Sequence, residues 1–265
     1  MKNTHTRTNP LRTLIVLLSV VLLGLCVFAV VGEDILIPRP EPGTVEEAVW
    51  LYAREHGHSL RDYPQSLLEL LKRNPETEQF VLEYPDAKVT IPVIDMSPYL
   101  EQDTVPLLLQ WDPRWGYMTY GSDVAGLTGC GPVCLSMAAL YVTGDPAFSP
   151  DAMIRFAAEH NYYVSGSGSS WTLISEGGPK LGLTVTELPL DEGRILKALA
   201  AGSPVICAMG PGDFTTSGHF IVIIGTQDGL FQINDPNSRA NSHKLWSYEQ
   251  IKDQIRNLWS VGSGE

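Results

Sequence analysis

The chain has 265 residues, which is enough for one sizeable domain with accessory segments. Its hydrophobic share of 44% and charged share of 18% are those of a globular protein and argue against disorder beyond the ends. The 30 acidic residues outnumber the 18 basic ones, giving a net charge of −12. This balance argues against a nucleic-acid partner, because nucleic-acid-binding proteins need a basic face.

The first 32 residues differ from the rest of the chain. They contain three basic residues and no acidic one, and the 18 residues from Leu14 to Val31 carry no charge. A run of this length can just cross a bilayer as a helix, and basic residues ahead of it keep the N-terminus in the cytoplasm. We therefore expect residues 1–32 to form a cytoplasmic tail and a single transmembrane helix in the cell membrane, with the rest outside. The alternative is a signal peptide cleaved before Glu33, which would give a secreted protein.

Two accessory segments are expected to follow. Residues 33–43 contain three prolines and are typical of a stiff spacer. Residues 44–106 are predicted to form a small helical prefix and a connecting loop, because Thr44 and Glu47 fit a capping box and leucines recur at helical spacing further on. The expected helices cover residues 44–56, 65–73 and a short stretch through residue 80. Packing on the main domain is the favoured interpretation of this prefix, and a protein-binding module is the alternative.

The main domain is predicted over residues 107–265. Capping residues, proline and glycine signals and apolar periodicity predict its elements. The expected helices cover residues 130–141, 150–160, 171–181, 191–201 and 247–259, and the expected strands cover residues 204–209, 219–225 and 230–234. Helices in the first half followed by an antiparallel sheet in the second half predict an α+β fold.

Cys130 has the sequence surroundings of a nucleophile. It lies in the run Gly129-Cys-Gly-Pro132, directly before an apolar stretch predicted to be helical. A helix N-terminus favours a thiolate, because backbone N–H groups and the helix dipole stabilise the anion, and the flanking glycines let a substrate approach the backbone. Cys134 and Cys207 are expected to be buried core residues, and Cys26 falls in the predicted anchor. With so few cysteines, the chain is not a disulfide scaffold.

A predicted hairpin brings a base and a carboxylate together. His219 opens its first strand and Asp235 closes the second, with a turn over residues 226–229 between them. We expect Gly225 to face Leu230, which makes Asp235 a near neighbour of His219. The carboxylate would then orient the imidazole and stabilise its cation.

The orienting group and the oxyanion donor have alternatives. Asn234 and Asn237 are rivals of Asp235 as the group that orients the imidazole. The side-chain amide of Gln110 is a candidate to face the negative charge that develops on a substrate carbonyl oxygen. His56 and His58 are two residues apart and would not share a helical face, so no metal site is expected, and no cofactor is required.

Four motifs in order resemble those of the C39-like peptidase family, a group of papain-like cysteine peptidases. They are Gln110–Gly116, Gly129–Pro132, Gly218–Val222 and Asn234–Asn237. The resemblance covers roughly residues 107–260 and implies a papain-like α+β fold. It also implies roles for four residues, with Cys130 as nucleophile, His219 as base, Asp235 as orienter and Gln110 as oxyanion donor.

The sequence departs from the transporter-linked members of that family, which remove double-glycine leader peptides. We find in it neither an ATPase nor a multi-span transporter, and the predicted anchor places the peptidase-like domain on the outer side. Gln110 lies 20 residues before Cys130, farther than in those members. We therefore do not expect double-glycine specificity.

The expected function is that of an extracytoplasmic thiol hydrolase. A cysteine peptidase acting on a peptide or protein substrate through an acyl-enzyme on Cys130 fits the residues best. One alternative is a catalytically inactive binding module on the same fold, displayed at the surface. The other is a cell-wall transpeptidase or amidase, in which an amine replaces water as the acceptor. The oligomeric state is left open.

Overall fold

The computed structural model describes residues 14–15, 18–22, 38–87 and 94–264, which belong to two compact units, Met1–Asp62 and Tyr63–Glu265. Among these described residues, no helix is both long and apolar enough to cross a membrane. Most of the predicted anchor and much of the predicted spacer lie outside the described residues. The anchor, the spacer and the predicted domain boundaries therefore stay predictions.

The described part of the first unit contains one helix, α2 (Val45–Glu55), and one 3₁₀ turn, η1 (Leu60–Asp62), in residues 38–62. The Thr44 side chain accepts a hydrogen bond from the backbone N of Glu47, as the predicted capping box requires. The Glu47 carboxylate accepts from the backbone N of Gly43 rather than from that of Thr44. The cap is therefore formed on one side only.

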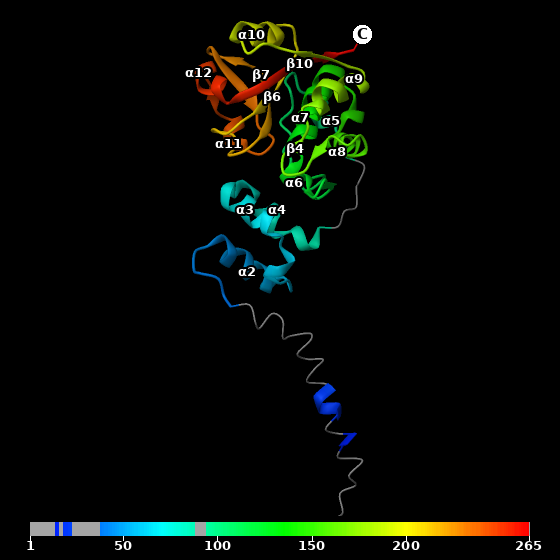
Figure 1. The fold of residues 1–265 in the computed structure, drawn as a ribbon, viewed down its shortest axis with the longest axis vertical. Helices are drawn as coiled ribbons and strands as arrows, with labels where there is room; N and C mark the ends of the chain where they lie inside the picture. The colour runs from blue at the N-terminus through cyan, green and yellow to red at the C-terminus, as the bar shows by residue number, and fades with distance from the viewer. Residues whose placement is uncertain (1–13, 16–17, 23–37, 88–93, 265) are drawn as a thin grey trace, which may run out of the picture. The chain divides into compact units, whose positions relative to one another are not determined.

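The second unit carries the remaining elements, drawn in Figure 1. Its α-helices are α3 (Gln65–Arg73), α4 (Glu78–Leu82), α5 (Ser97–Leu100), α6 (Ala125–Thr128), α7 (Cys130–Thr143), α8 (Pro150–Glu159), α9 (Gly178–Lys180), α10 (Glu192–Ala200), α11 (Arg239–Ser242) and α12 (Tyr248–Ile251). Single 3₁₀ turns are η2 (Pro75–Thr77), η3 (Tyr84–Asp86), η4 (Pro146–Phe148) and η6 (Lys252–Gln254), and a π-helical turn, η5 (Leu173–Gly177), precedes α9. Its strands are β1 (Thr119–Tyr120), β2 (Asp123–Val124), β3 (Tyr163–Val164), β4 (Gly168–Ser169), β5 (Leu183–Glu187), β6 (Val205–Met209), β7 (His219–Gln227), β8 (Leu230–Asn234), β9 (Leu245–Trp246) and β10 (Ile255–Ser263).

The main sheet has six strands in the order β5-β10-β6-β7-β8-β9, and each neighbouring pair is antiparallel. The predicted helix over residues 247–259 is wrong beyond its first turn. The capping box of Ser247 and Gln250 is present, but it starts only the short helix α12. The chain then enters β10, which pairs with strands on both sides, so two long-range hydrogen-bond ladders override the local helical signal.

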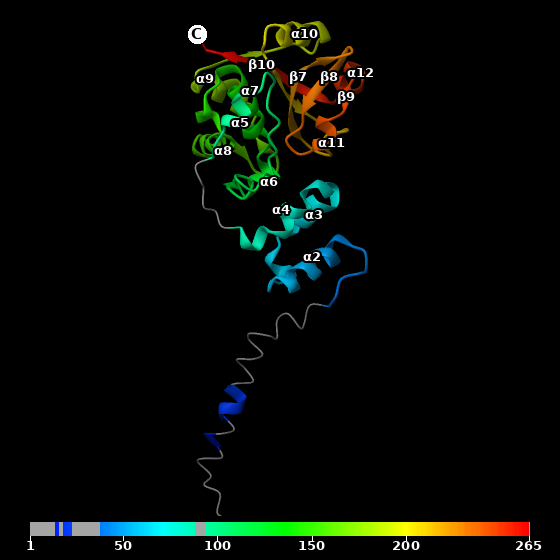
Figure 2. The same cartoon turned by 180° about the vertical axis from the view of Figure 1, so that it is seen from behind.

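Both faces of this sheet are covered. Along β6 the side chains alternate, so that Ile206 and Ala208 join one buried cluster while Val205, Cys207 and Met209 join the other. Helices α7 and α8 contribute to the first cluster, and α10 and α12 contribute to the second. Figures 1 and 2 show the green helices α7 to α9 to one side of the orange and red strands. Because α7 is apolar all round and buried from its first residue through Leu140, it forms the centre of the fold.

The segment of α3 and α4 is built into this unit. Phe80 of α4 is buried and stacks on Tyr117, with ring centroids 4.4 Å apart, and Tyr117 donates a hydrogen bond to the backbone oxygen of Phe80. The Phe80 ring lies directly over Gly116 and Gly126. A Cβ atom at either glycine would collide with this ring. Residues 65–82 therefore pack on the main domain, although they precede it in sequence.

Substituting Phe80→Ala should lower the free energy of unfolding by about 3–5 kcal/mol, because it removes a buried aromatic ring that neighbouring glycines cannot replace. Chemical denaturation followed by circular dichroism measures this loss, with the exposed Glu78→Ala as the matched control on the same helix. A loss below about 1 kcal/mol for Phe80→Ala would show that α4 is not part of the cooperative unit.

Candidate active site

Cys130 is the first residue of α7, with Gly129 as the N-cap. The N–H groups of a first helical turn have no partner within the helix, so they can face an anion or a substrate oxygen. Both glycines that flank Cys130 are required, because other parts of the chain lie too close for a side chain there. A Cβ atom on Gly129 would lie 2.6 Å from the backbone oxygen of Ala125, and one on Gly131 would lie 2.6 Å from Ser169. Cys130 keeps 8% of its surface exposed, whereas Cys134 and Cys207 are fully buried, as expected for core residues.

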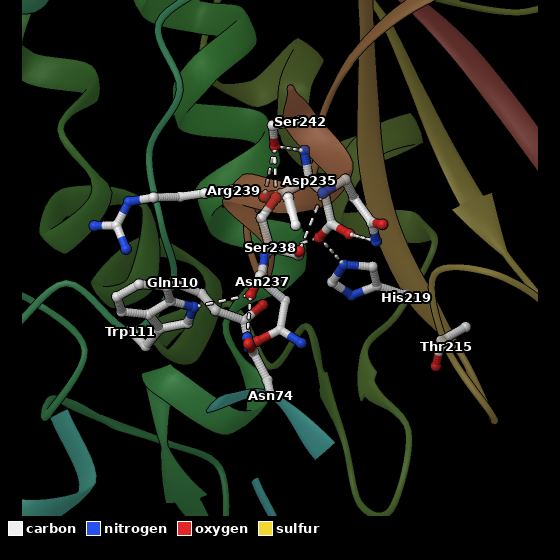
Figure 3. Close-up of polar contacts among 12 residues, drawn as sticks. Asn74, Gln110, Trp111, Thr215, His219, Asp235, Asn237, Ser238, Arg239 and Ser242 are labelled. Atoms are coloured by element: carbon white, nitrogen blue, oxygen red, sulfur yellow. Dashed lines mark hydrogen bonds and ion pairs between the residues drawn. The ribbon is translucent and has the colours of Figure 1, made fainter. Parts of the chain in front are cut away.

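His219 and Asp235 meet at the open end of the hairpin formed by β7 and β8. Nε2 of the imidazole lies 2.7 Å from Oδ1 of the carboxylate, and the side chains are 8% and 1% exposed. Figure 3 shows the His219 ring directed at Asp235. Since Nε2 is engaged by the carboxylate, Nδ1 is the nitrogen left for the thiol.

The predicted register of this hairpin is wrong. Strand β7 continues to Gln227, which pairs with Leu230, and the turn is only Asp228 and Gly229, whose φ angles of 53° and 76° fit a tight two-residue hairpin turn. A β-bulge between Ile223 and Gly225 then shifts the pairing by one residue. The two functional side chains still meet, because the chain turns sharply just after β8.

Electrostatics favour the protonated form of the His219 ring. Burial alone lowers the pKa of His219, but the Asp235 carboxylate outweighs this through its charge and hydrogen bond, and the pKa rises from 6.5 to about 10. The Cys130 sulfur acts in the same direction, as a hydrogen-bond partner and as a negative charge. The protonated imidazole is therefore the form of His219 that this environment stabilises.

Three groups besides His219 hold Asp235 in place. Its Oδ1 accepts from the backbone N of Asn237 at 2.8 Å, and its Oδ2 accepts from Nδ2 of Asn241 at 2.8 Å. Its own backbone N donates to Oγ of Ser242 at 2.9 Å. The sequence analysis missed Asn241 and Ser242. Ser238 is the N-cap of α11 and could have signalled the helix that carries them.

Neither rival orienter makes a hydrogen bond to the imidazole. Nδ2 of Asn234 donates instead to the backbone oxygens of Val105 and Pro106, at 3.0 and 3.1 Å. Asn237 uses its backbone oxygen to accept from Nε1 of Trp111 at 3.0 Å and leaves its buried Oδ1 without a partner. The geometry therefore favours Asp235 as the orienting residue.

Gln110 lies beside the same pair. Its backbone N donates to the oxygen of Pro236 at 2.7 Å, which attaches it to the turn after Asp235. Its Nε2 donates to the oxygen of Gly126 at 2.8 Å, while Oε1 is buried without a partner. An amide nitrogen has two hydrogens, so one remains for a substrate oxygen.

Residues from before the matched motifs also hold this site, and no sequence pattern predicts their contacts. Asn74 donates through Nδ2 to the backbone oxygen of Asn237 at 2.5 Å, as Figure 3 shows. The Glu76 carboxylate accepts from Oγ of Ser238 at 2.9 Å and from the backbone nitrogens of Arg239 and Ala240 at 3.0 and 3.2 Å. Because α11 carries Asn241, the segment after α3 supports the loop that holds Asp235.

A cavity of about 400 Å³ opens at His219. It is lined by Leu70, Arg73, Asn74, Gln110, Leu127, Asn237, His219 and the loop residues 212–218. His219 and Gln110 both line this cavity, whereas Cys130 is not among its lining residues. Within the described residues, no group of three or more His, Cys, Asp or Glu side chains is placed to hold a metal ion.

Limited alkylation should distinguish the three cysteines of the described domain. We expect iodoacetamide at neutral pH to modify Cys130 first, because Cys134 and Cys207 are fully buried and burial raises the pKa of both thiols. Peptide mass spectrometry of the full-length protein reads out each site. Equal modification of the three thiols in the native protein would contradict the geometry.

His219 should stay protonated to unusually high pH. Its pKa is raised above the ordinary 6.5, so the stability gained from its pairing is fully present below pH 6.5 and is lost as the pH rises through about 10. We expect NMR of histidine-labelled protein to show this titration, and Asp235→Asn to lower the pKa strongly, because the largest contribution that opposes burial is then removed. A wild-type pKa close to 6.5 would show that the carboxylate does not control the ring.

One family model and several solved structures are similar to this chain. The model of the Peptidase_C39 like family matches residues 102–264, more than half of the chain. The peptidase domain of Streptococcus ComA, a bi-functional ABC transporter involved in a quorum-sensing pathway, is 19% identical, with a TM-score of 0.40 over 52% of this chain and 93% of that one. A structure described as a C39-like peptidase from Bacillus anthracis is 15% identical, with a TM-score of 0.40 over 59% of this chain and 94% of that one. The search of curated proteins gave no match. The family match confirms the resemblance found in the sequence, and the chain belongs to the Peptidase_C39 like family.

Proposed function

We propose that this protein is a cysteine peptidase that hydrolyses peptide bonds through an acyl-enzyme on Cys130. One observation carries the proposal, the 2.7 Å contact between Nε2 of His219 and Oδ1 of Asp235. The Cys130 sulfur also contributes to the raised pKa of this imidazole. A thiol, an imidazole and a carboxylate in this order form the activated nucleophile of acyl transfer. Membership of the family supports the same reaction.

In the first step the Cys130 thiolate attacks the carbonyl carbon of the scissile bond. The remaining amide hydrogen of Gln110 and the backbone N–H of Cys130 would stabilise the oxyanion that forms. The His219 imidazolium gives its Nδ1 proton to the leaving amine, which departs as the free peptide and leaves a thioester on Cys130.

In the second step water releases the acyl group. The neutral imidazole takes a proton from water, and the hydroxide attacks the thioester carbonyl. Collapse of this second intermediate expels the Cys130 thiolate and frees a carboxylic acid, while His219 keeps the proton. Throughout both steps Asp235 holds Nε2 and stabilises the cation, so its role is orientation rather than proton transfer.

The proposed place of action is outside the cytoplasm. This part of the proposal rests on the uncharged run from Leu14 to Val31 and the basic residues before it. The domain would reach peptide or protein substrates outside the membrane, held there by the anchor or released from it by cleavage.

Turnover should depend on Cys130, His219 and Gln110 to different degrees. We expect Cys130→Ala and His219→Ala to abolish cleavage of a peptide library, read by mass spectrometry. Gln110→Ala should lower kcat about 100- to 1000-fold, because it removes one of two oxyanion donors. Cys207→Ala, a buried thiol on the sheet, is the matched control and should retain activity. Cleavage that survives Cys130→Ala, or peptide binding without any cleavage by the wild type, would contradict the proposal.

A further inference from the structure

The cavity at His219 is lined by side chains of both charges. Arg73, the last residue of α3, is the one Lys or Arg among the described residues that line it, and Asp213, in the loop between β6 and β7, is the one Asp or Glu. The His219 imidazole, whose raised pKa favours its protonated form, is a second cationic group in the lining. The remaining lining residues are uncharged, with Leu70, Leu127 and Phe214 as the largest hydrophobic members. A ligand that enters the cavity therefore meets two cationic groups and one carboxylate.

The backbone next to Arg73 is attached to the loop after β8, which contains Asp235 and Asn237. The next residue, Asn74, is 9% exposed and donates to the backbone oxygen of Asn237 at 2.5 Å. On the inner side of α3, four leucines are buried: Leu67, Leu68, Leu70 and Leu71. The backbone that carries Arg73 is thus fixed relative to His219, and a fixed charge loses less entropy when it binds a ligand.

The Arg73 guanidinium has no hydrogen-bond partner among the described residues, and its charge interacts with Glu69 one turn earlier on α3, where it helps Lys72 to lower the pKa of that carboxyl. Other arginines of the described chain pair with carboxylates, for example Arg114 with Asp112 at 2.6 Å and Arg155 with Asp151 at 2.6 Å. Arg73 is exposed, and within the described residues it makes no hydrogen bond or ion pair. A basic residue at a helix C-terminus complements the helix dipole. This explains why Arg73 is basic, but it does not explain why its side chain lines the cavity.

The Asp213 carboxylate is also held in place. Nε2 of Gln254 donates to Oδ2 of Asp213 at 2.7 Å, and the backbone N of Asp213 donates to Oε1 of Gln254 at 2.7 Å. This carboxylate repels an acidic group of a ligand, whereas the cationic groups of Arg73 and His219 attract one.

We propose that Arg73 forms a substrate subsite that selects peptides with an acidic side chain on the α3 side of the cleft. The guanidinium would take the Asp or Glu carboxylate through paired N–H donors. This inference rests on the proposed peptidase function for its meaning, because it names the class of peptide that the site accepts. It concerns residues outside the segment matched by the family model, 102–264.

The test measures binding separately from cleavage. Full-length protein carrying Cys130→Ala is titrated with labelled peptides of alanine and leucine in which one Glu, Gln or Lys is moved through every position, and fluorescence anisotropy gives each Kd. We expect the best Glu peptide to bind roughly three- to tenfold more tightly than its Gln counterpart, and this ratio to shrink as salt is raised. Adding Arg73→Gln should remove the preference, and Arg73→Glu should transfer it to the Lys peptide.

The matched control is Lys72→Glu, which changes the charge equally on the neighbouring residue without touching the cavity lining. It should leave the Glu preference unchanged, and unfolding curves confirm that each variant is folded. Equal Kd values for the Glu, Gln and Lys peptides, an equal effect of Lys72→Glu, or no binding of any peptide would overturn the subsite.

Wild-type cleavage of the same peptides is scored separately. Selective binding without cleavage defeats the peptidase proposal alone, and unselective cleavage defeats the subsite alone.

Discussion

The contact between the Asp235 carboxylate and Nε2 of His219 is the interaction on which the site depends. Both side chains are nearly excluded from water, where an unpaired carboxylate would be strongly destabilising. The carboxylate is instead satisfied by the imidazole, by the backbone N of Asn237 and by the side chain of Asn241. These contacts fix the ring and raise its pKa to about 10, so that a cation is available beside Cys130.

Each part of the fold contributes one component of this arrangement. Helix α7 presents Cys130 at its first turn and is held centrally by the apolar cluster it shares with the sheet. The β7–β8 hairpin sets the imidazole against the carboxylate. The segment from Asn74 to Glu76 then holds the loop after β8 through the Asn237 oxygen and the N-terminus of α11. This segment lies before the family-matched region but is a structural part of the site. The exposed Arg73 directly precedes it at the end of α3 and is therefore of functional interest.

The sequence predicted that His219 and Asp235 lie together better than it predicted the sheet that carries them. The motifs around Cys130 and His219 are local, and a glycine-flanked cysteine before an apolar run is readable without a structure. The first part of strand β10 was predicted as a helix and strand β5 was not predicted, because both are stabilised by pairing with residues 46 to 80 positions away. The hairpin register was wrong at the turn, which contains only Asp228 and Gly229, and a β-bulge that no local signal marks then shifts the pairing again. The supporting contacts of Asn74, Glu76 and Asn241 are tertiary and could not be read from spacing. The predicted anchor lies mostly outside the described residues and is neither supported nor contradicted by them.

The most direct measurement is the capture of the acyl-enzyme. Full-length protein is mixed with an activated peptide ester, quenched in acid within milliseconds and analysed as intact protein and as peptides by mass spectrometry. We expect one acyl group per chain, attached as a thioester to Cys130, and its loss by hydrolysis to be slowed strongly by His219→Ala. Turnover of the ester with no acyl group on Cys130, or acylation that is unchanged when His219 is replaced, would contradict nucleophilic catalysis by this cysteine.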